Sequence, residues 1–92
     1  MKRVSGIYGG DPEGMKRLAS LFQKHGQELD QMIRDLNSNT QGSQNIWQGP
    51  GANRFREAWS QAKPSFDKMV TAFQDAHKDI SNRAEGFRNV GK

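Results

Sequence analysis

Two runs of apolar residues with a regular spacing constrain the fold of this chain more than any other feature of its sequence. The first run extends from Met15 to Leu36, and the second extends from Ala52 to Ile80 and is prolonged by Phe87. Within each run the steps alternate between three and four residues. This spacing places the side chains on one side of an α-helix, which turns once in 3.6 residues. The chain is therefore predicted to be all-α, with two long amphipathic helices.

Proline and glycine indicate where the helices begin and where the chain reverses. Asp11 followed by Pro12, and Gly49 followed by Pro50, are typical helix starts, because Asp caps a helix and proline fits its first turn. Residues 37–45 contain no apolar side chain, so the first helix is expected to end near Ser38–Gln41. The connection is short, and it makes the two helices antiparallel neighbours. We expect one helical-hairpin domain over 1–92, with a flexible arm at 1–10, a helix at about 11–39, a turn at 40–49, a helix at about 50–88 and a tail at 89–92.

The apolar stripe is wider than a single hairpin can cover. With Met15 and Ala52 at heptad position a, the runs fill positions a and d, and further apolar residues fall at e and g. Each helix should therefore contact more than one neighbour, which favours pairing with a second hairpin in a four-helix bundle. The flanking apolar residues are Ala19, Ile33 and Val70 at e, and Leu21, Ala58 and Ala72 at g. The predicted core and dimer seam consists of Leu18, Phe22, Leu29, Met32, Leu36, Phe55, Trp59, Phe66, Met69, Phe73 and Ile80.

The sequence contains few of the residues that catalysis or metal binding requires. It has no cysteine and two histidines, of which His25 at position d should line the bundle and His77 at position e should be solvated. It has neither a metalloprotease-type His-Glu pattern nor a Gly-Lys-Ser/Thr phosphate loop. Two helices are also expected to enclose no concavity for a ligand. We therefore predict a protein that is not an enzyme and holds no cofactor and no metal.

The formal charge of +4 raises the possibility of nucleic-acid binding, but the distribution of charge argues against it. Residues 11–40 carry four basic against five acidic side chains, and residues 50–92 carry eight against five. The two signs are interspersed, as on a solvated helix face. A basic nucleic-acid-associated hairpin and a membrane-active amphipathic hairpin remain as alternative functions.

The segment 43–59 resembles the signature of the WXG family. Trp47-Gln48-Gly49 matches the Trp-x-Gly turn, and Ala52, Phe55 and Trp59 resemble the seam residues that follow it. The turn also lies halfway along the chain, between two heptad helices, as in that family. Members are early-secretory-antigen-like hairpin proteins exported by type VII secretion systems, and the family is associated with virulence.

The resemblance implies a small protein-binding module that is made in the bacterial cytoplasm and secreted. Its expected partners are a similar helical hairpin, in a homodimer or a heterodimer, and the membrane motor ATPase of the secretion system. Trp47, Gln48 and Gly49 would form the recognition turn. Residues 4–14 contain no apolar core of signal-peptide length, so export without a cleavable leader is expected. Contact with the membrane itself stays open.

One element of the family pattern is missing. Export-competent pairs carry a Tyr-x-x-x-Asp/Glu signal near the C-terminus of one partner, whereas the only tyrosine of this chain is Tyr8. Either another subunit supplies the signal or this protein uses a different one. The first possibility favours a heteromeric pair.

Overall fold

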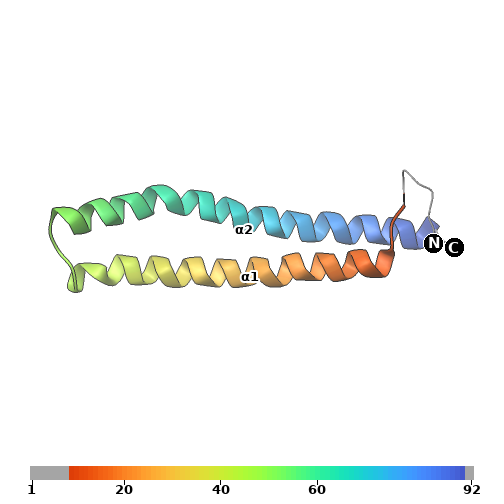
Figure 1. Cartoon of the computed structure of the whole chain (residues 1–92), viewed down its shortest axis with the longest axis horizontal. Coiled ribbons are helices and arrows are strands. Elements are labelled where there is room, and N and C mark those ends of the chain that lie inside the picture. The colour runs from red at the N-terminus through yellow and green to blue at the C-terminus, as the bar shows by residue number, and fades with distance from the viewer. Residues whose placement is uncertain (1–8, 91–92) are drawn as a thin grey trace. The chain divides into compact units, whose positions relative to one another are not determined.

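The computed structural model of the protein describes residues 9–90, which form two long α-helices packed as a hairpin (Figure 1). Helix α1 spans Pro12–Gly42, a short 3-10 helix η1 spans Ser43–Asn45, and helix α2 spans Pro50–Val90. Residues 9–90 contain no strand. The predicted all-α hairpin is confirmed. The arm predicted at 1–10 lies mostly outside the described residues.

Both helices begin at the proline that the sequence indicated. The carboxylate of Asp11 lies over the first turn of α1, since a Cβ atom built on Gly14 would come within 2.7 Å of Asp11 Oδ2. The other end of α1 lies at Gly42, beyond the expected end near 38–41. The polar residues at this end continue the helix, and the Asn39 side chain donates a hydrogen bond of 2.8 Å to the carbonyl of Asp35, one turn earlier. The loss of apolar spacing therefore marked the end of the apolar stripe and not the end of the helix.

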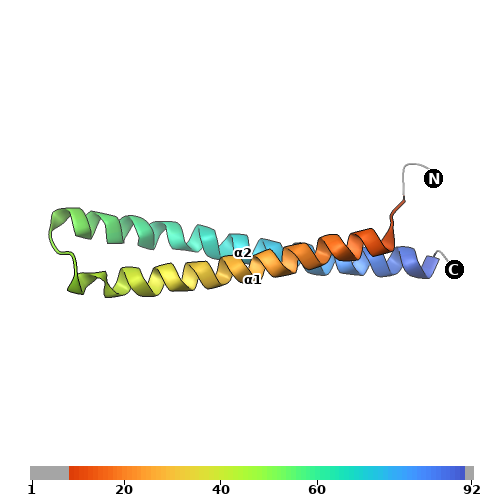
Figure 2. The ribbon, with the colours of Figure 1, turned by 60° about the horizontal axis from the view of Figure 1, so that its bottom comes forward.

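The hairpin consists of two compact units. The open-end unit comprises residues 1–25 and 73–92, of which 9–25 and 73–90 are described, and the turn-end unit comprises residues 26–72. Figures 1 and 2 agree in placing α1 beside α2 within each unit, with the two helices antiparallel.

The most buried line of side chains differs from the predicted seam. The buried apolar residues are Ala19, Ile33, Ala52, Val70 and Ala84. All except Ala52 occupy position e, so the contact between the helices is centred on a and e and not on a and d. Small residues at these positions, including the buried Gly26, allow the two backbones to approach closely. The larger side chains at d are thereby displaced to the rim of the contact.

The predicted seam residues consequently fall into two groups. Six of them are partly buried in the hairpin: Phe22, Leu29, Trp59, Phe66, Phe73 and Ile80. The other five expose between 46% and 56% of their surface: Leu18, Met32, Phe55 and Met69 at position d, and Leu36, an exception at position a. The sequence predicted that these five residues would be buried, but in the hairpin by itself they are about half exposed. Whether a partner covers them stays a prediction.

Aromatic packing and ion pairs hold α1 to α2 in the open-end unit. The rings of Phe22 and Phe73 meet edge to face, with centroids 5.7 Å apart. Nearer the helix ends, Arg88 Nη2 lies 2.6 Å from Glu13 Oε2, and Lys16 pairs with Glu85. Gly10 fits closely against this end of the unit, because an added Cβ atom would come within 2.8 Å of the Phe87 ring.

His77 also belongs to the contact between the helices of the open-end unit. Its Nδ1 atom lies 3.0 Å from the carbonyl oxygen of Ala19, and the residue is partly buried. The prediction of a solvated His77 is therefore wrong. The reason is the register: position e faces the neighbouring helix in this hairpin.

Candidate functional site

The turn between the helices is compact and hydrogen-bonded. The carbonyl oxygen of Ser43 accepts bonds from the backbone amides of Ile46 and Trp47, at 3.0 and 2.9 Å. The side chain of Gln48 donates a bond of 2.8 Å to the carbonyl of Gln44. Gly49 has a φ of +114°, a conformation that residues with a Cβ atom rarely adopt, and this confirms the role predicted for this glycine in the reversal.

Trp47 is presented at the surface of this turn. Its ring lies beside that of Phe55, with centroids 5.7 Å apart, while 46% of the residue remains exposed. Within residues 9–90, the indole N–H of Trp47 donates no hydrogen bond. Trp47 therefore combines a supported ring face with a polar donor that is available to a partner.

Arg56 connects α2 to the turn and was not identified from the sequence. Its Nη1 atom donates hydrogen bonds to Ser43 Oγ at 2.9 Å and to the carbonyl oxygen of Trp47 at 3.1 Å. Ser43 is buried, with 8% of its surface exposed, and its hydroxyl donates to the carbonyl of Thr40. Arg56 occupies position e in the first turns of α2. Its heptad position could have indicated this role in the sequence, because residues at position e of α2 face α1.

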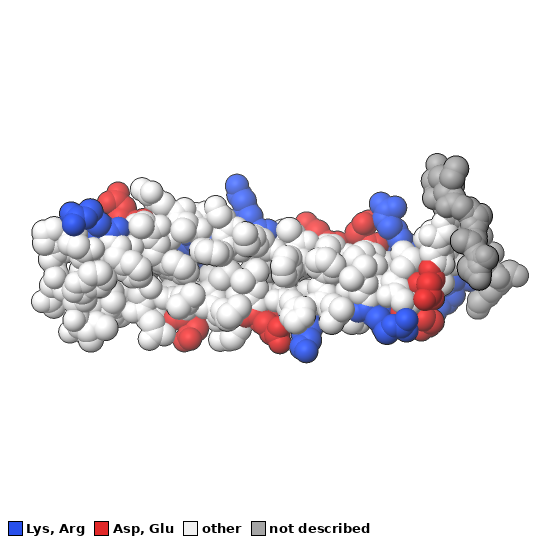
Figure 3. Space-filling model, viewed as in Figure 1, with Lys and Arg blue, Asp and Glu red and all other residues white. Residues whose placement is uncertain are grey.

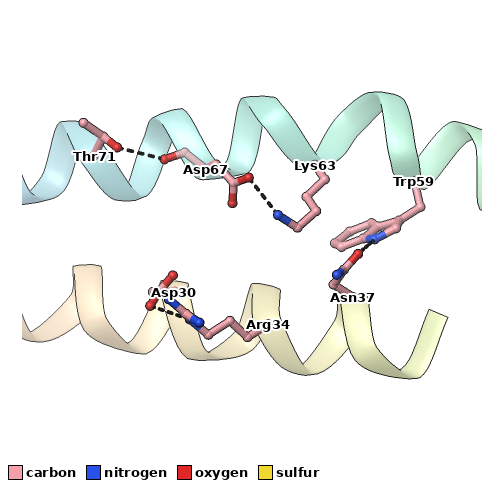
Figure 4. A network of polar contacts seen from close by, with 7 residues as sticks. All are labelled: Asp30, Arg34, Asn37, Trp59, Lys63, Asp67 and Thr71. Carbon is pink, nitrogen blue, oxygen red and sulfur yellow. Dashed lines mark hydrogen bonds and ion pairs between the residues drawn. The ribbon is translucent and has the colours of Figure 1, made fainter. Parts of the chain in front are cut away.

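A second polar contact joins the helices of the turn-end unit (Figure 4). The indole N–H of Trp59 donates a bond of 2.9 Å to Asn37 Oδ1, and the Trp59 ring stacks on Phe66 at 5.8 Å. Lys63 and Asp67 form an ion pair within α2, one turn further on. The two tryptophans thus differ in role: the indole N–H of Trp59 is used inside the hairpin.

An open groove of about 460 Å³ lies beside these contacts in the turn-end unit. Its lining is mainly polar and includes Asn37, Gln41, Asn53, Arg56 and Trp59. The groove is open to solvent along the surface of this unit, so it is not an enclosed ligand cavity.

The rest of the described chain offers little for metal or membrane chemistry. His25 lines a shallow apolar hollow of the open-end unit with Leu21, Phe22 and Phe73. Among the described residues, no group of three His, Asp or Glu side chains could hold a metal ion. The described helices also include none with the length and apolar character needed to cross a bilayer.

Known proteins share both the sequence pattern and the fold. Residues 8–92 match the model of the WXG100 family, proteins of 100 residues with WXG. The chain is 26% identical over 87 residues to Protein YukE of Bacillus subtilis (strain 168). The aligned residues make up 95% of this chain and 90% of YukE.

Two crystal structures of a secreted protein, EsxB of Bacillus anthracis str. Sterne, are similar in fold. The selenomethionine-labelled form superimposes with a TM-score of 0.79 at 22% identity, covering 96% of this chain and 100% of EsxB. A point mutant of EsxB gives a TM-score of 0.78 at 22% identity, covering 95% and 97%. With a family match over almost the whole chain, and with Trp47-Gln48-Gly49 at the turn between its two helices, this protein belongs to the WXG100 family.

Proposed function

We propose that this protein is a small protein-binding module that a type VII secretion system exports, and that the turn Trp47-Gln48-Gly49 is the element recognised during export. Membership of the WXG100 family supports this proposal, as does the fold shared with a protein described as secreted. The observation that carries it is the exposure of Trp47, which leaves about half of its surface open to solvent in a hydrogen-bonded turn.

The geometry of Trp47 suits a recognition residue in two respects. A half-exposed indole has apolar area to bury against a partner and an N–H group to donate, the combination that makes tryptophan common in binding hot spots. The turn is already ordered by the bonds to Ser43 and Gln44. Binding would therefore cost little conformational entropy. The proposed receiver is the membrane motor ATPase of the secretion system.

A second helical hairpin is the proposed partner in the exported unit. Leu18, Met32, Leu36, Phe55 and Met69 leave about half of their surface exposed, although they are large and apolar. Figure 3 marks the charged side chains visible from one side; the white surface between them belongs to uncharged residues, both polar and apolar. Exposed apolar area of this kind usually marks an association surface.

Export of a Trp47→Ala variant tests the recognition role. We expect at least a tenfold fall in the ratio of secreted to cellular protein, while the far-UV circular dichroism spectrum stays helical. Ile46→Ala is the matched control, because Ile46 is the neighbouring apolar residue of the same turn and is 85% exposed. Normal export of a folded Trp47→Ala protein would refute the recognition role.

Light scattering of a Met32→Asp variant tests the proposed association. The wild-type protein should have the mass of a dimer, or form a 1:1 complex with a hairpin partner, and Met32→Asp should prevent this while the chain remains helical. Gln31→Asp provides the control, since it places the same charge on the adjacent, exposed residue of α1. If Met32→Asp associates as well as Gln31→Asp does, the surface around Met32 is not the interface.

A further inference from the structure

Within the described chain, Arg56 is the one side chain of α2 that is hydrogen-bonded both to the start of the connection between the helices and to the recognition turn. The first contact is with Ser43, the first residue of η1, and the second is with Trp47 itself, through its carbonyl oxygen. The second guanidinium nitrogen, Nη2, donates to Asn53 Oδ1 at 3.3 Å and steadies the side chain along α2. Arg56 thereby ties the start of α2 to the residue whose ring is presented.

The acceptors of Arg56 indicate that its geometry matters more than its charge. They are a hydroxyl, a backbone carbonyl and a side-chain amide, and none of them is a carboxylate. A guanidinium group holds its donors in a rigid planar fork, so it can bond several oxygens with fixed directions. The ammonium group of lysine is compact and lacks this fork.

We propose that Arg56 is the positioning residue for Trp47. It fixes the backbone of Trp47 at the carbonyl, while Phe55 supports the ring. The result is that the ring and its free indole N–H keep one orientation at the surface. The consequence for export rests on the proposed function of the turn, whereas the positioning itself is a property of the isolated protein.

The chain supplies a matched control two residues away. Arg54 carries the same side chain on the same turn of α2, is exposed, and makes no hydrogen bond or ion pair with residues 9–90. An effect of charge alone would appear equally in variants of Arg54 and of Arg56. An effect of positioning would appear only at Arg56.

The first measurement is the backbone ¹⁵N order parameter of Trp47 and Gln48 in the full chain. In Arg56→Met, which keeps the length of the side chain without its donors, we expect this parameter to fall from about 0.85 to below about 0.6, with the α2 amides unchanged. Arg56→Lys should not restore the order, and Arg54→Met should leave it intact. Ser43→Ala removes one acceptor of Arg56 and should loosen the turn less, which gives a second variant if Arg56→Met proves too unstable.

The second measurement is export, made in parallel on the same variants. Arg56→Met should reduce export by about the same factor as Trp47→Ala, and the double variant should be no worse than Trp47→Ala alone, because both changes act through one ring. An ordered Trp47 backbone in both Arg56→Met and Arg56→Lys would overturn the positioning role. Normal export of Trp47→Ala would instead refute the proposed function of the turn, and it would leave the order measurement to decide the role of Arg56.

Discussion

The two units of the hairpin share a pair of antiparallel helices but are held together by different interactions. In the open-end unit, ion pairs lie on the rim of an apolar contact, at Glu13–Arg88 and Lys16–Glu85, and a hydrogen bond joins the helices between His77 and the carbonyl of Ala19. In the turn-end unit, directional hydrogen bonds cross between the helices, from Trp59 to Asn37 and from Arg56 to Ser43. Exposed ion pairs tolerate many geometries, whereas an indole or guanidinium bonded to a partly buried acceptor permits few.

The directional bonds of the turn-end unit suit the recognition role proposed for its turn. A surface that must be recognised needs one defined conformation, and directional bonds to partly buried groups supply it. In the open-end unit, the helices are held by packed alanines at Ala19 and Ala84, by the hydrogen bond of His77 and by the ion pairs at its end.

Placing a charge at Ile33 should break the turn-end unit. Ile33 is 3% exposed, so Ile33→Asp buries an unpaired carboxylate and should lower the free energy of unfolding by about 3 kcal/mol or more. Chemical denaturation followed by circular dichroism measures the change. The control is Gln31→Asp on the same turn of α1, which should stay within about 0.5 kcal/mol. Similar losses at the two positions would show that the contact is not centred on a and e.

Removing the indole donor should weaken the turn-end unit less. Trp59→Phe leaves Asn37 Oδ1 without its donor and should cost about 1–3 kcal/mol, measured by the same method. Asn37→Leu combined with Trp59→Phe should recover part of this loss, because no polar atom is then left unpaired. A double-mutant cycle with strictly additive losses would show that the bond contributes nothing of its own.

Neutralising an ion pair should have the smallest effect, and it should depend on salt. Glu13→Gln removes the nearer of two acidic partners of Arg88 and should destabilise the open-end unit by less than about 1 kcal/mol. The loss of stability relative to the wild-type protein should vanish at about 1 M salt, where charges are screened within a few ångströms. Amide hydrogen exchange in α1 and α2 reports the two units separately. A loss that persists in high salt would mean that the side chains contribute by packing.

Much of the fold follows from the sequence because helix geometry imposes a spacing. The three-and-four steps predicted both helices, Pro12 and Pro50 predicted where they begin, and Gly49 predicted the backbone reversal. The spacing identified the apolar stripe but not its centre. That centre is set by how closely two backbones can approach, and small residues such as Ala19 and Ala84 decide it only once both helices are placed.

The polar contacts of the site were harder to predict from the sequence. Arg56, His77 and Asn37 each reach an acceptor or donor on the other side of the hairpin. A pattern of apolar residues cannot distinguish a polar side chain that has such a partner from one that is solvated. Trp47 was found through its motif, whereas the residue that holds it was not, because its partners are a hydroxyl and backbone groups of the turn.

The order in which the hairpin closes follows from how far apart in sequence its contacts lie. Arg56 and Ser43 are 13 residues apart, whereas Arg88 and Glu13 are 75 residues apart. Closing a loop costs about 0.6 kcal/mol more for each doubling of its length, so the distant pair carries an extra cost of about 1.5 kcal/mol. The contacts at the turn should therefore form early, and the helices should zip together toward the open end. The Glu13–Arg88 pair should form last and open first, so a force applied at the open end meets the most easily broken contact while the turn is still intact.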